Sequence, residues 1–395
     1  MKNYHDILNE ELLLTGLCRT SFNTEQAGMV KKLSQGTVNW DYFCRMASEH
    51  GIAALVYHNL EKLSLLNELP DETKNFLRQS LLISLNKNTL NTSSLVNVLK
   101  LLNKHKIKTV LLKGIALELT VYENEGIRQM TDIDVLMKRE DCLKARSLLL
   151  ADGFVEMPLK SVFYKYIIGY IGKHLPTLIK DKFRLELHHE LFGKENNLLT
   201  RLLFDTSQTT EINGAEAFTP DPCIFFLYLV KHLSMHEMNN ESQLRLYTDL
   251  VVMIEKEGKH ILTPELIEYS EKAGMTKTLA LHLEPLREFW GIPFPECINE
   301  IIDKHSVQDS LNRFLYFLKS PKNNPVCDRS RLYRHTFNEV PGFHRKLLFL
   351  LGDLFPSVSF MKKRYNCPDI LCIIPRYLLR WGKLWYLIKK NGYPE

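Results

Sequence analysis

The sequence predicts an α+β fold in which a small mixed-sheet core is flanked by N-terminal and C-terminal helical regions. Two observations lead to this prediction. Residues 1–105 and 216–320 carry apolar residues at helical spacing, whereas residues 106–215 contain short β-like runs separated by turn residues. Apolar residues make up 45% of the 395-residue chain and charged residues 25%, a globular composition that excludes collagen-like and wholly disordered proteins. A chain of this length is expected to form more than one packed region.

The N-terminal region, residues 1–105, is predicted to be helical. Asn39 is a suitable N-cap for a helix that begins at Trp40, and Gly51 is suited to end that helix. Leucines at roughly helical spacing then predict a long amphipathic helix, which we interpret as a face of an ordinary helical bundle. These leucines are Leu81, Leu82, Leu85, Leu90, Leu95 and Leu99.

The core, residues 106–215, is predicted to be a small α/β unit. Its elements, in order, are a strand at 107–112, a tight turn at Lys113-Gly114, a helix at 115–122, a strand at 131–137, a helix at 138–153, and two β-like runs at 174–180 and 183–191. Residues 180–182 are a candidate hairpin turn between the last two runs. We expect these runs to belong to one small mixed sheet.

Residues 216–320 are predicted to be a helical domain that covers the cleft of the core. Residues 321–395 form a basic, aromatic-rich region with 14 Lys and Arg against 5 Asp and Glu, a net charge of +9. Its last segment, residues 375–390, is predicted to be an amphipathic helix. Aromatic and basic residues interleave along it: Arg376, Tyr377, Arg380, Trp381, Lys383, Trp385 and Tyr386. The segment either binds an anionic partner, which is a nucleic acid or a membrane surface, or docks on the protein body with solvated charges.

The composition also bears on location. The first residues mix acids with apolar residues and are not expected to form a signal peptide. No apolar run reaches the 18 or more residues that a membrane helix needs, so no integral membrane segment is expected. Eight cysteines without a CxxC pair indicate neither a disulfide scaffold nor a cysteine zinc site. The sequence therefore predicts a cytoplasmic protein.

Two aspartates carry the strongest chemical signal. Asp132 and Asp134 are two residues apart on a predicted strand, so their carboxylates point the same way while Ile133 and Val135 pack behind them. Two carboxylates held side by side repel each other, and a hard cation such as Mg²⁺ relieves that repulsion. The pattern is typical of a site where metal ions serve phosphoryl transfer.

Further residues around this pair are suited to bind phosphate. Lys113 and Gly114 lie between a strand and a helix, where free backbone N–H groups and a positive charge can cradle phosphates. Arg128 can make a bidentate phosphate contact. Glu186 lies on a later predicted strand and can add a third carboxylate, and by the alternation of that strand His188 shares its face.

These motifs, in this order, resemble the bacterial uncharacterised nucleotidyltransferase family of the polymerase-beta-like superfamily. The resemblance rests on LLKG, an Arg shortly before DIDVLM, and LELHHEL, with similar helical framing over residues 7–260. It implies that Asp132 and Asp134 hold the metals, that Glu186 is the third acid and activates the acceptor, and that Lys113 and Gly114 meet the triphosphate. The sequence departs from the common pattern in two places: Lys-Gly replaces Gly-Ser in the phosphate turn, and Glu186 replaces an Asp.

The implied activity is transfer of a nucleoside monophosphate from a nucleoside triphosphate to a hydroxyl group, with two Mg²⁺ ions and with Mn²⁺ as the alternative ion. The acceptor is not identified by the sequence and is a small molecule, a glycan, a peptide or an RNA. Two other functions stay open: a DxD-type metal-dependent glycosyltransferase, and a nucleotide-binding protein without catalysis.

Two residue pairs on the predicted C-terminal helices have a functional and a structural interpretation. His232 and His236 share a helix face through their i, i+4 spacing and either line the cleft or contact substrate. Leu233 occupies the position of the glutamate in HExxH, which excludes a zinc protease. Arg245 and Asp249 have the same spacing and form either an ion pair or a substrate contact.

Overall fold

The computed structural model describes residues 7–122, 126–170, 172–192, 197–305, 308–321, 337–338, 340–367 and 369–390. The chain forms two compact units, the first made of Met1–Asp134 and Arg201–Cys327, the second of Val135–Thr200 and Asp328–Glu395. The first boundary falls inside a single strand, β2 (Ile133–Leu136), between Asp134 and Val135. The four-domain division predicted from the sequence stays a prediction.

The strands form one seven-stranded mixed sheet in the order β3-β4-β5-β2-β1-β7-β6. β1 pairs with β7 in parallel, whereas β3 with β4, β4 with β5, and β6 with β7 are antiparallel. The remaining bounds are β1 (Val110–Leu112), β3 (Val155–Glu156), β4 (Leu178–Lys180), β5 (Phe183–His188), β6 (Gln208–Ile212) and β7 (Ala215–Thr219). The α+β fold class with helical flanks is therefore confirmed, and the sheet is larger than the sequence predicted because β3, β6 and β7 were not predicted as strands.

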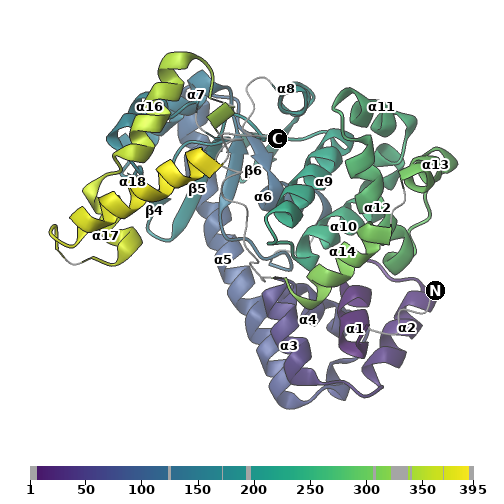
Figure 1. Ribbon diagram of the computed structural model, residues 1–395. Helices are drawn as coiled ribbons and strands as arrows, with labels where there is room; N and C mark the ends of the chain where they lie inside the picture. The colour runs from purple at the N-terminus through teal and green to yellow at the C-terminus, as the bar shows by residue number, and fades with distance from the viewer. Residues whose placement is uncertain are drawn as a thin grey trace. The chain divides into compact units, whose positions relative to one another are not determined.

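The first unit begins with short helices that precede one long helix, α5 (Figure 1). They are α1 (Asn9–Leu17), α2 (Thr24–Ser34), α3 (Trp40–Glu49), α4 (Ala53–Lys62), the short 3₁₀ helix η1 (Leu66–Glu68) and α5 (Asp71–Lys104). The Asn39 side chain accepts a hydrogen bond from the Tyr42 backbone N–H, so Asn39 caps α3 as predicted. Gly51 follows that helix with φ of 68°, the left-handed conformation expected where a helix ends.

The buried face of α5 differs from the predicted leucine stripe. Leu95 and Leu99 are buried, but Leu82 and Leu90 are more than half exposed. Asn88 takes a buried position in the middle of the helix, and its amide donates to both carboxylate oxygens of Glu118 and to the Arg128 carbonyl. The predicted stripe was therefore wrong in this half, because hydrogen bonds to a neighbouring segment, rather than apolar packing, determine which face is buried.

The predicted helix at residues 115–122 also has a different form. α6 (Lys113–Leu117) begins at Lys113 itself and continues into the π-helical segment η2 (Glu118–Tyr122). Residue 113 is thus the first residue of the helix rather than part of a separate turn. Its φ of 46° lies in the left-handed region, which is uncommon for a residue with a side chain.

Most of the described residues of the first unit from 222 to 319 are helical, as predicted for residues 216–320. The helices are α9 (Pro222–Met238), α10 (Leu244–Ile261), α11 (Pro264–Lys272), α12 (Thr276–Trp290), α13 (Glu296–His305) and α14 (Gln308–Lys319). α9 packs against α10, α11 and α12, and most of its side chains from Cys223 to Val230 are buried. This near-continuous apolar run explains why α9 is the central helix of this group.

The second unit joins a core segment to the C-terminal helices. Its helices are α7 (Arg139–Ala151), the 3₁₀ helix η3 (Val162–Tyr166), α16 (Phe343–Leu354), α17 (Val358–Tyr365) and α18 (Ile373–Lys390), and α8 (Leu198–Asp205) crosses its boundary. Tyr164 and Phe349 stack in the cluster that joins η3 to α16. The buried Asp353 carboxylate pairs with the Lys160 ammonium and accepts a hydrogen bond from the Tyr164 hydroxyl.

The predicted C-terminal helix is confirmed as α18, and it is docked on the second unit. The Trp381 indole N–H donates to the Leu354 carbonyl over 2.6 Å, and the Arg380 guanidinium donates to the Asp353 carbonyl over 3.0 Å. The side chains of Lys383, Trp385 and Tyr386 lie outside those that the structure describes. Among the described residues, none of the helices combines the length and the apolar character needed to cross a bilayer.

Candidate functional site

The two predicted aspartates lie at the start of β2, one before the strand and one within it. The strand begins at Ile133, so Asp134 lies within it and Asp132 immediately precedes it. Ile133 and Val135 are fully buried, as predicted for the residues that pack behind the carboxylates. Asp134 is 3% exposed, whereas Asp132 is half-buried. The common orientation of the two carboxylates stays a prediction.

Lys113 pairs directly with one of these aspartates. The Lys113 ammonium lies 2.6 Å from Oδ1 of Asp134, and the lysine side chain is 16% exposed. Since β1 and β2 are neighbours in the sheet, the end of β1 delivers Lys113 to the side of Asp134. The ammonium therefore compensates the charge of a carboxylate that is almost fully withdrawn from water.

Gly114 has a steric role in this structure. A Cβ atom on residue 114 would lie 2.4 Å from Nη1 of Arg128 and 2.7 Å from Cγ of Met130. No side chain fits in that space, so glycine is required for the Arg128 side chain to pass over the first turn of α6. The predicted phosphate contact of Gly114 stays a prediction.

Arg128 binds an aspartate from α10. Its Nε and Nη2 donate to Oδ1 and Oδ2 of Asp249 over 2.8 and 2.7 Å, and the Tyr122 hydroxyl donates to Oδ1 over 2.8 Å. Burial lowers the pKa of the Arg128 guanidinium, whereas the charge of Asp249 raises it. The effect of the carboxylate is larger, so the pKa of Arg128 lies above the usual range. Arg128, which was predicted to contact phosphate, thus makes its bidentate contact with a carboxylate of the protein.

The predicted ion pair between Arg245 and Asp249 is replaced by this contact. Arg245 instead donates to the Gln129 carbonyl over 2.9 Å and to the Gln243 side chain over 3.2 Å. Burial and the nearby Arg128 charge lower the pKa of Arg245, and the negative charges of Asp249 and Asp132 oppose that effect.

Glu186 and His188 share one face of β5, as their spacing predicted. Oε2 of Glu186 lies 3.5 Å from Nε2 of His188 and 3.6 Å from Nε2 of His174. The Thr177 hydroxyl donates to Oε1 of Glu186 over 3.2 Å. These contacts hold the carboxylate between two imidazoles, with His188 fully buried beneath it.

His174 is the residue at this site that the sequence reasoning missed. Its Nδ1 lies 2.7 Å from the Leu175 carbonyl oxygen, and its Nε2 faces Oε2 of Glu186 at 3.6 Å. Burial, followed by the neighbouring His188, lowers the pKa of His174. The predicted hairpin between residues 174–180 and 183–191 contained the signal, because antiparallel pairing returns residues near 174 to the end of β5.

Neighbouring strands of the sheet bring three donor groups together. Ligand atoms of Asp134 on β2 and of Glu186 and His188 on β5 all lie within 4.8 Å of one another, the one such group among the described residues. Two carboxylates suit Mg²⁺ or Mn²⁺, and an imidazole adds a ligand that transition metals accept. The donor set therefore fits a divalent cation, with Asp132 next to the group but not part of it.

The paired histidines of α9 lie on one face of that helix. The rings of His232 and His236 are 4.5 Å apart between centroids, and His232 stacks on Tyr228 at 6.0 Å. The i, i+4 geometry predicted from the sequence is thus confirmed. Their contact with substrate stays a prediction.

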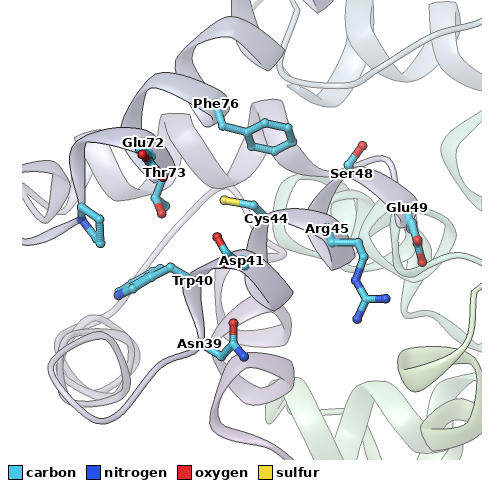
Figure 2. Close-up of a pocket in the computed structure, with 11 residues that line it drawn as sticks. Asn39, Trp40, Asp41, Cys44, Arg45, Ser48, Glu49, Glu72, Thr73 and Phe76 are labelled. Carbon is cyan, nitrogen blue, oxygen red and sulfur yellow. The ribbon is translucent and has the colours of Figure 1, made fainter.

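Two surface cavities of the first unit contain none of the predicted site residues. One, of about 600 Å³, lies between α3 and the start of α5 (Figure 2). Cys44 and Arg45 project into it from α3, and Thr73 and Phe76 from α5. The other, of about 730 Å³, is lined by residues near β7 and α9. The candidate site therefore stays on the sheet, away from the residues that line these two cavities.

Comparison with known proteins bears on this geometry. No curated protein matches the sequence. The model of a family described as uncharacterised nucleotidyltransferase matches residues 36–291, which include β1, β2, β5 and the helices α9 to α12. The match covers more than half of the chain and contains every residue of the carboxylate and imidazole group. The chain therefore belongs to the uncharacterised nucleotidyltransferase family.

Proposed function

We propose that this protein transfers a nucleoside monophosphate from a nucleoside triphosphate to a hydroxyl group of an acceptor molecule, in a reaction that depends on Mg²⁺ or Mn²⁺. The observation that carries the proposal is the group formed by Asp134, Glu186 and His188 on β2 and β5. Membership of a nucleotidyltransferase family supports the reaction type. The reaction is assigned to the cytoplasm, and the acceptor is a small molecule, a glycan, a peptide or an RNA.

Asp134 and Glu186 would hold the cation, with His188 as a nitrogen ligand and Asp132 as the predicted fourth contributor. A bound divalent cation supplies charge stabilisation to the triphosphate and activates the acceptor hydroxyl, and two such ions are the family expectation. Glu186 is suited to the acceptor side, with the Thr177 hydroxyl donating a hydrogen bond that orients its carboxylate.

Lys113 would supply positive charge to the triphosphate. Its ammonium lies 2.6 Å from Asp134, at the edge of the proposed cation site, where it would be within reach of a phosphate oxygen held by the cation. Arg128 would position the first turn of α6 rather than contact the triphosphate, because its guanidinium is bound to Asp249 and its side chain lies over Gly114. His232, Arg245 and Asp249 stay candidates for substrate contact.

The test is incubation of the purified protein with each α-labelled nucleoside triphosphate, Mg²⁺ or Mn²⁺, and a cell extract that contains acceptors. Labelled product and released pyrophosphate are measured together. We expect Asp134→Asn and Glu186→Gln each to lower both signals by at least about a hundredfold, because a lost carboxylate removes transition-state charge stabilisation. Thermal unfolding followed by circular dichroism shows whether each variant is folded.

Matched controls use acids that lie away from the group. Asp152→Asn and Glu211→Gln remove exposed carboxylates and should leave transfer unchanged. Wild-type transfer by a folded Asp134→Asn variant contradicts the proposal. So does release of a nucleoside diphosphate from a sugar donor, or triphosphate binding without turnover across the acceptor panel.

A further inference from the structure

An apolar surface faces outward on the C-terminal helix of the second unit. Leu371 lies in the turn before α18, and Ile374, Leu378 and Leu379 lie on the helix. Each of these four side chains is more than half exposed. Leu371, Ile374 and Leu378 follow the three- and four-residue spacing that places side chains along one helix face. We call these four residues the α18 outer face.

The orientation of this face is fixed by the opposite side of the helix. Ile373 is buried, and the Tyr377 hydroxyl donates to the Pro356 carbonyl. The Arg380 guanidinium donates to the Asp353 carbonyl, and one of its nitrogens lies 3.6 Å from the Asp353 carboxylate. Ile373, Tyr377 and Arg380 thus dock the helix, whereas the four aliphatic residues of the α18 outer face stay exposed. A helix that only closes a core has the reverse arrangement.

Positive charge surrounds the α18 outer face. Residues 340–382 carry seven Lys and Arg against two Asp and Glu, and one of these acids, Asp353, is buried in its ion pairs. α17 packs against α18 (Figure 1). Lys362, Lys363 and Arg364 are exposed on α17, and Arg376 is exposed on α18 itself. An exposed aliphatic stripe with cationic neighbours is the composition of helices that lie in the surface of an anionic bilayer.

We propose that the α18 outer face binds the surface of a membrane rich in anionic lipid. The aliphatic side chains would enter the boundary between head groups and acyl chains, and the lysines and arginines of α17 and α18 would contact lipid phosphates. A second copy of the chain is a poorer occupant, because it would bring two cationic surfaces together. A nucleic acid would satisfy the charges but leave the aliphatic residues exposed to water.

The test is flotation of the full-length protein with vesicles. One set contains about 70% phosphatidylcholine and 30% phosphatidylglycerol, and the other only phosphatidylcholine. We expect binding to the anionic vesicles that weakens as NaCl rises from about 0.05 M to about 0.5 M. A triple variant, Leu371→Ser with Ile374→Ser and Leu378→Ser, should reduce the bound fraction at least about tenfold, since it removes most of the apolar contact.

The matched control uses aliphatic residues that are equally exposed on the first unit. Leu82→Ser with Ile83→Ser and Leu90→Ser removes three such side chains from α5 and should leave vesicle binding unchanged. All six positions are at the surface, so both variants should unfold at the wild-type temperature. Lys362→Gln with Lys363→Gln should weaken binding to anionic vesicles and leave the salt-insensitive fraction unchanged.

Several results overturn the proposal. One is equal vesicle binding by the α18 and α5 variants, and another is binding without a preference for anionic vesicles. A third is that wild type and α18 variant bind a labelled single-stranded RNA with the same affinity while neither binds vesicles. A wild-type dimer in size-exclusion chromatography that the α18 variant dissociates, without vesicle binding, overturns it as well. None of these readouts requires nucleotidyl transfer, so the two proposals can fail separately.

Discussion

Replacement of Asp249 by alanine should destabilise the first unit strongly. The Asp249 carboxylate accepts three hydrogen bonds, two from Arg128 and one from the Tyr122 hydroxyl, and the Arg128 and Asp249 side chains are 7% and 2% exposed. Without Asp249, the guanidinium is left charged and nearly buried with no carboxylate opposite. Loss of one partner of a buried ion pair costs about 3–5 kcal/mol of the free energy of unfolding.

The assay is urea-induced unfolding of wild type and variants at one pH and one salt concentration. Asp303→Ala is the matched control, because the Asp303 carboxylate pairs with Arg287 at 2.9 Å but is 67% exposed. That variant should lose about 1 kcal/mol or less. The double variant Arg128→Met with Asp249→Ala should be more stable than Asp249→Ala alone, since it removes the uncompensated charge.

The reasoning about this buried pair is refuted by either of two results. One is a cost for Asp249→Ala no larger than that for Asp303→Ala. The other is a double variant that is no more stable than Asp249→Ala alone. In both cases the buried geometry would contribute no more than a surface pair, and Asp249 would be better interpreted as a residue kept for substrate contact.

Two further predictions concern the first unit. Gly114→Ala should lower the free energy of unfolding by about 1–3 kcal/mol in thermal or urea unfolding, because its methyl group would overlap the Arg128 guanidinium; a stability equal to wild type contradicts the steric role of this glycine. Burial alone would raise the pKa of Glu237, but contacts with His282 and Tyr247 outweigh it and lower the pKa below 4.5. Ionised Glu237 therefore contributes stability that is complete above about pH 4.5 and is lost as pH falls through the folded-state pKa. Glu237→Gln should flatten the acid side of a stability-against-pH curve, and an unchanged curve contradicts this assignment.

Elements with local signals could be predicted from the sequence. The cap at Asn39, the turn between β4 and β5, and the common face of Glu186 and His188 each depend on residues within a few positions of one another. Asp181 in that turn has a φ of 55°, which aspartate tolerates better than most residues.

One hairpin was missed although its signal was present. Asn213 and Gly214 join β6 to β7 with φ of 47° and 77°, the two positive values that a type I′ turn requires. The β6 strand is polar and mostly exposed, so it lacks the apolar alternation by which strands are recognised. The Asn-Gly pair was the better guide to a strand at the edge of the sheet.

The contacts that shape the site could not be predicted in the same way. Arg128 and Asp249 are 121 residues apart in the sequence, and no periodicity relates them. Arg245 is closer to Asp249 in sequence, which favoured the wrong pair. The bidentate guanidinium geometry and the burial of both groups, rather than helix spacing, determine which arginine Asp249 binds.

The second unit is built from two segments that are far apart in the sequence, and this affects how the chain folds during synthesis. Residues Val135–Thr200 belong to a unit whose remaining part is Asp328–Glu395. The buried cluster of Tyr164 and Ile167 is completed by Val340 and Phe349, so the apolar packing around η3 stays incomplete until α16 has left the ribosome. During translation the first unit can be finished while the second is still open. Premature termination before α16 would leave an apolar surface that chaperones and proteases recognise.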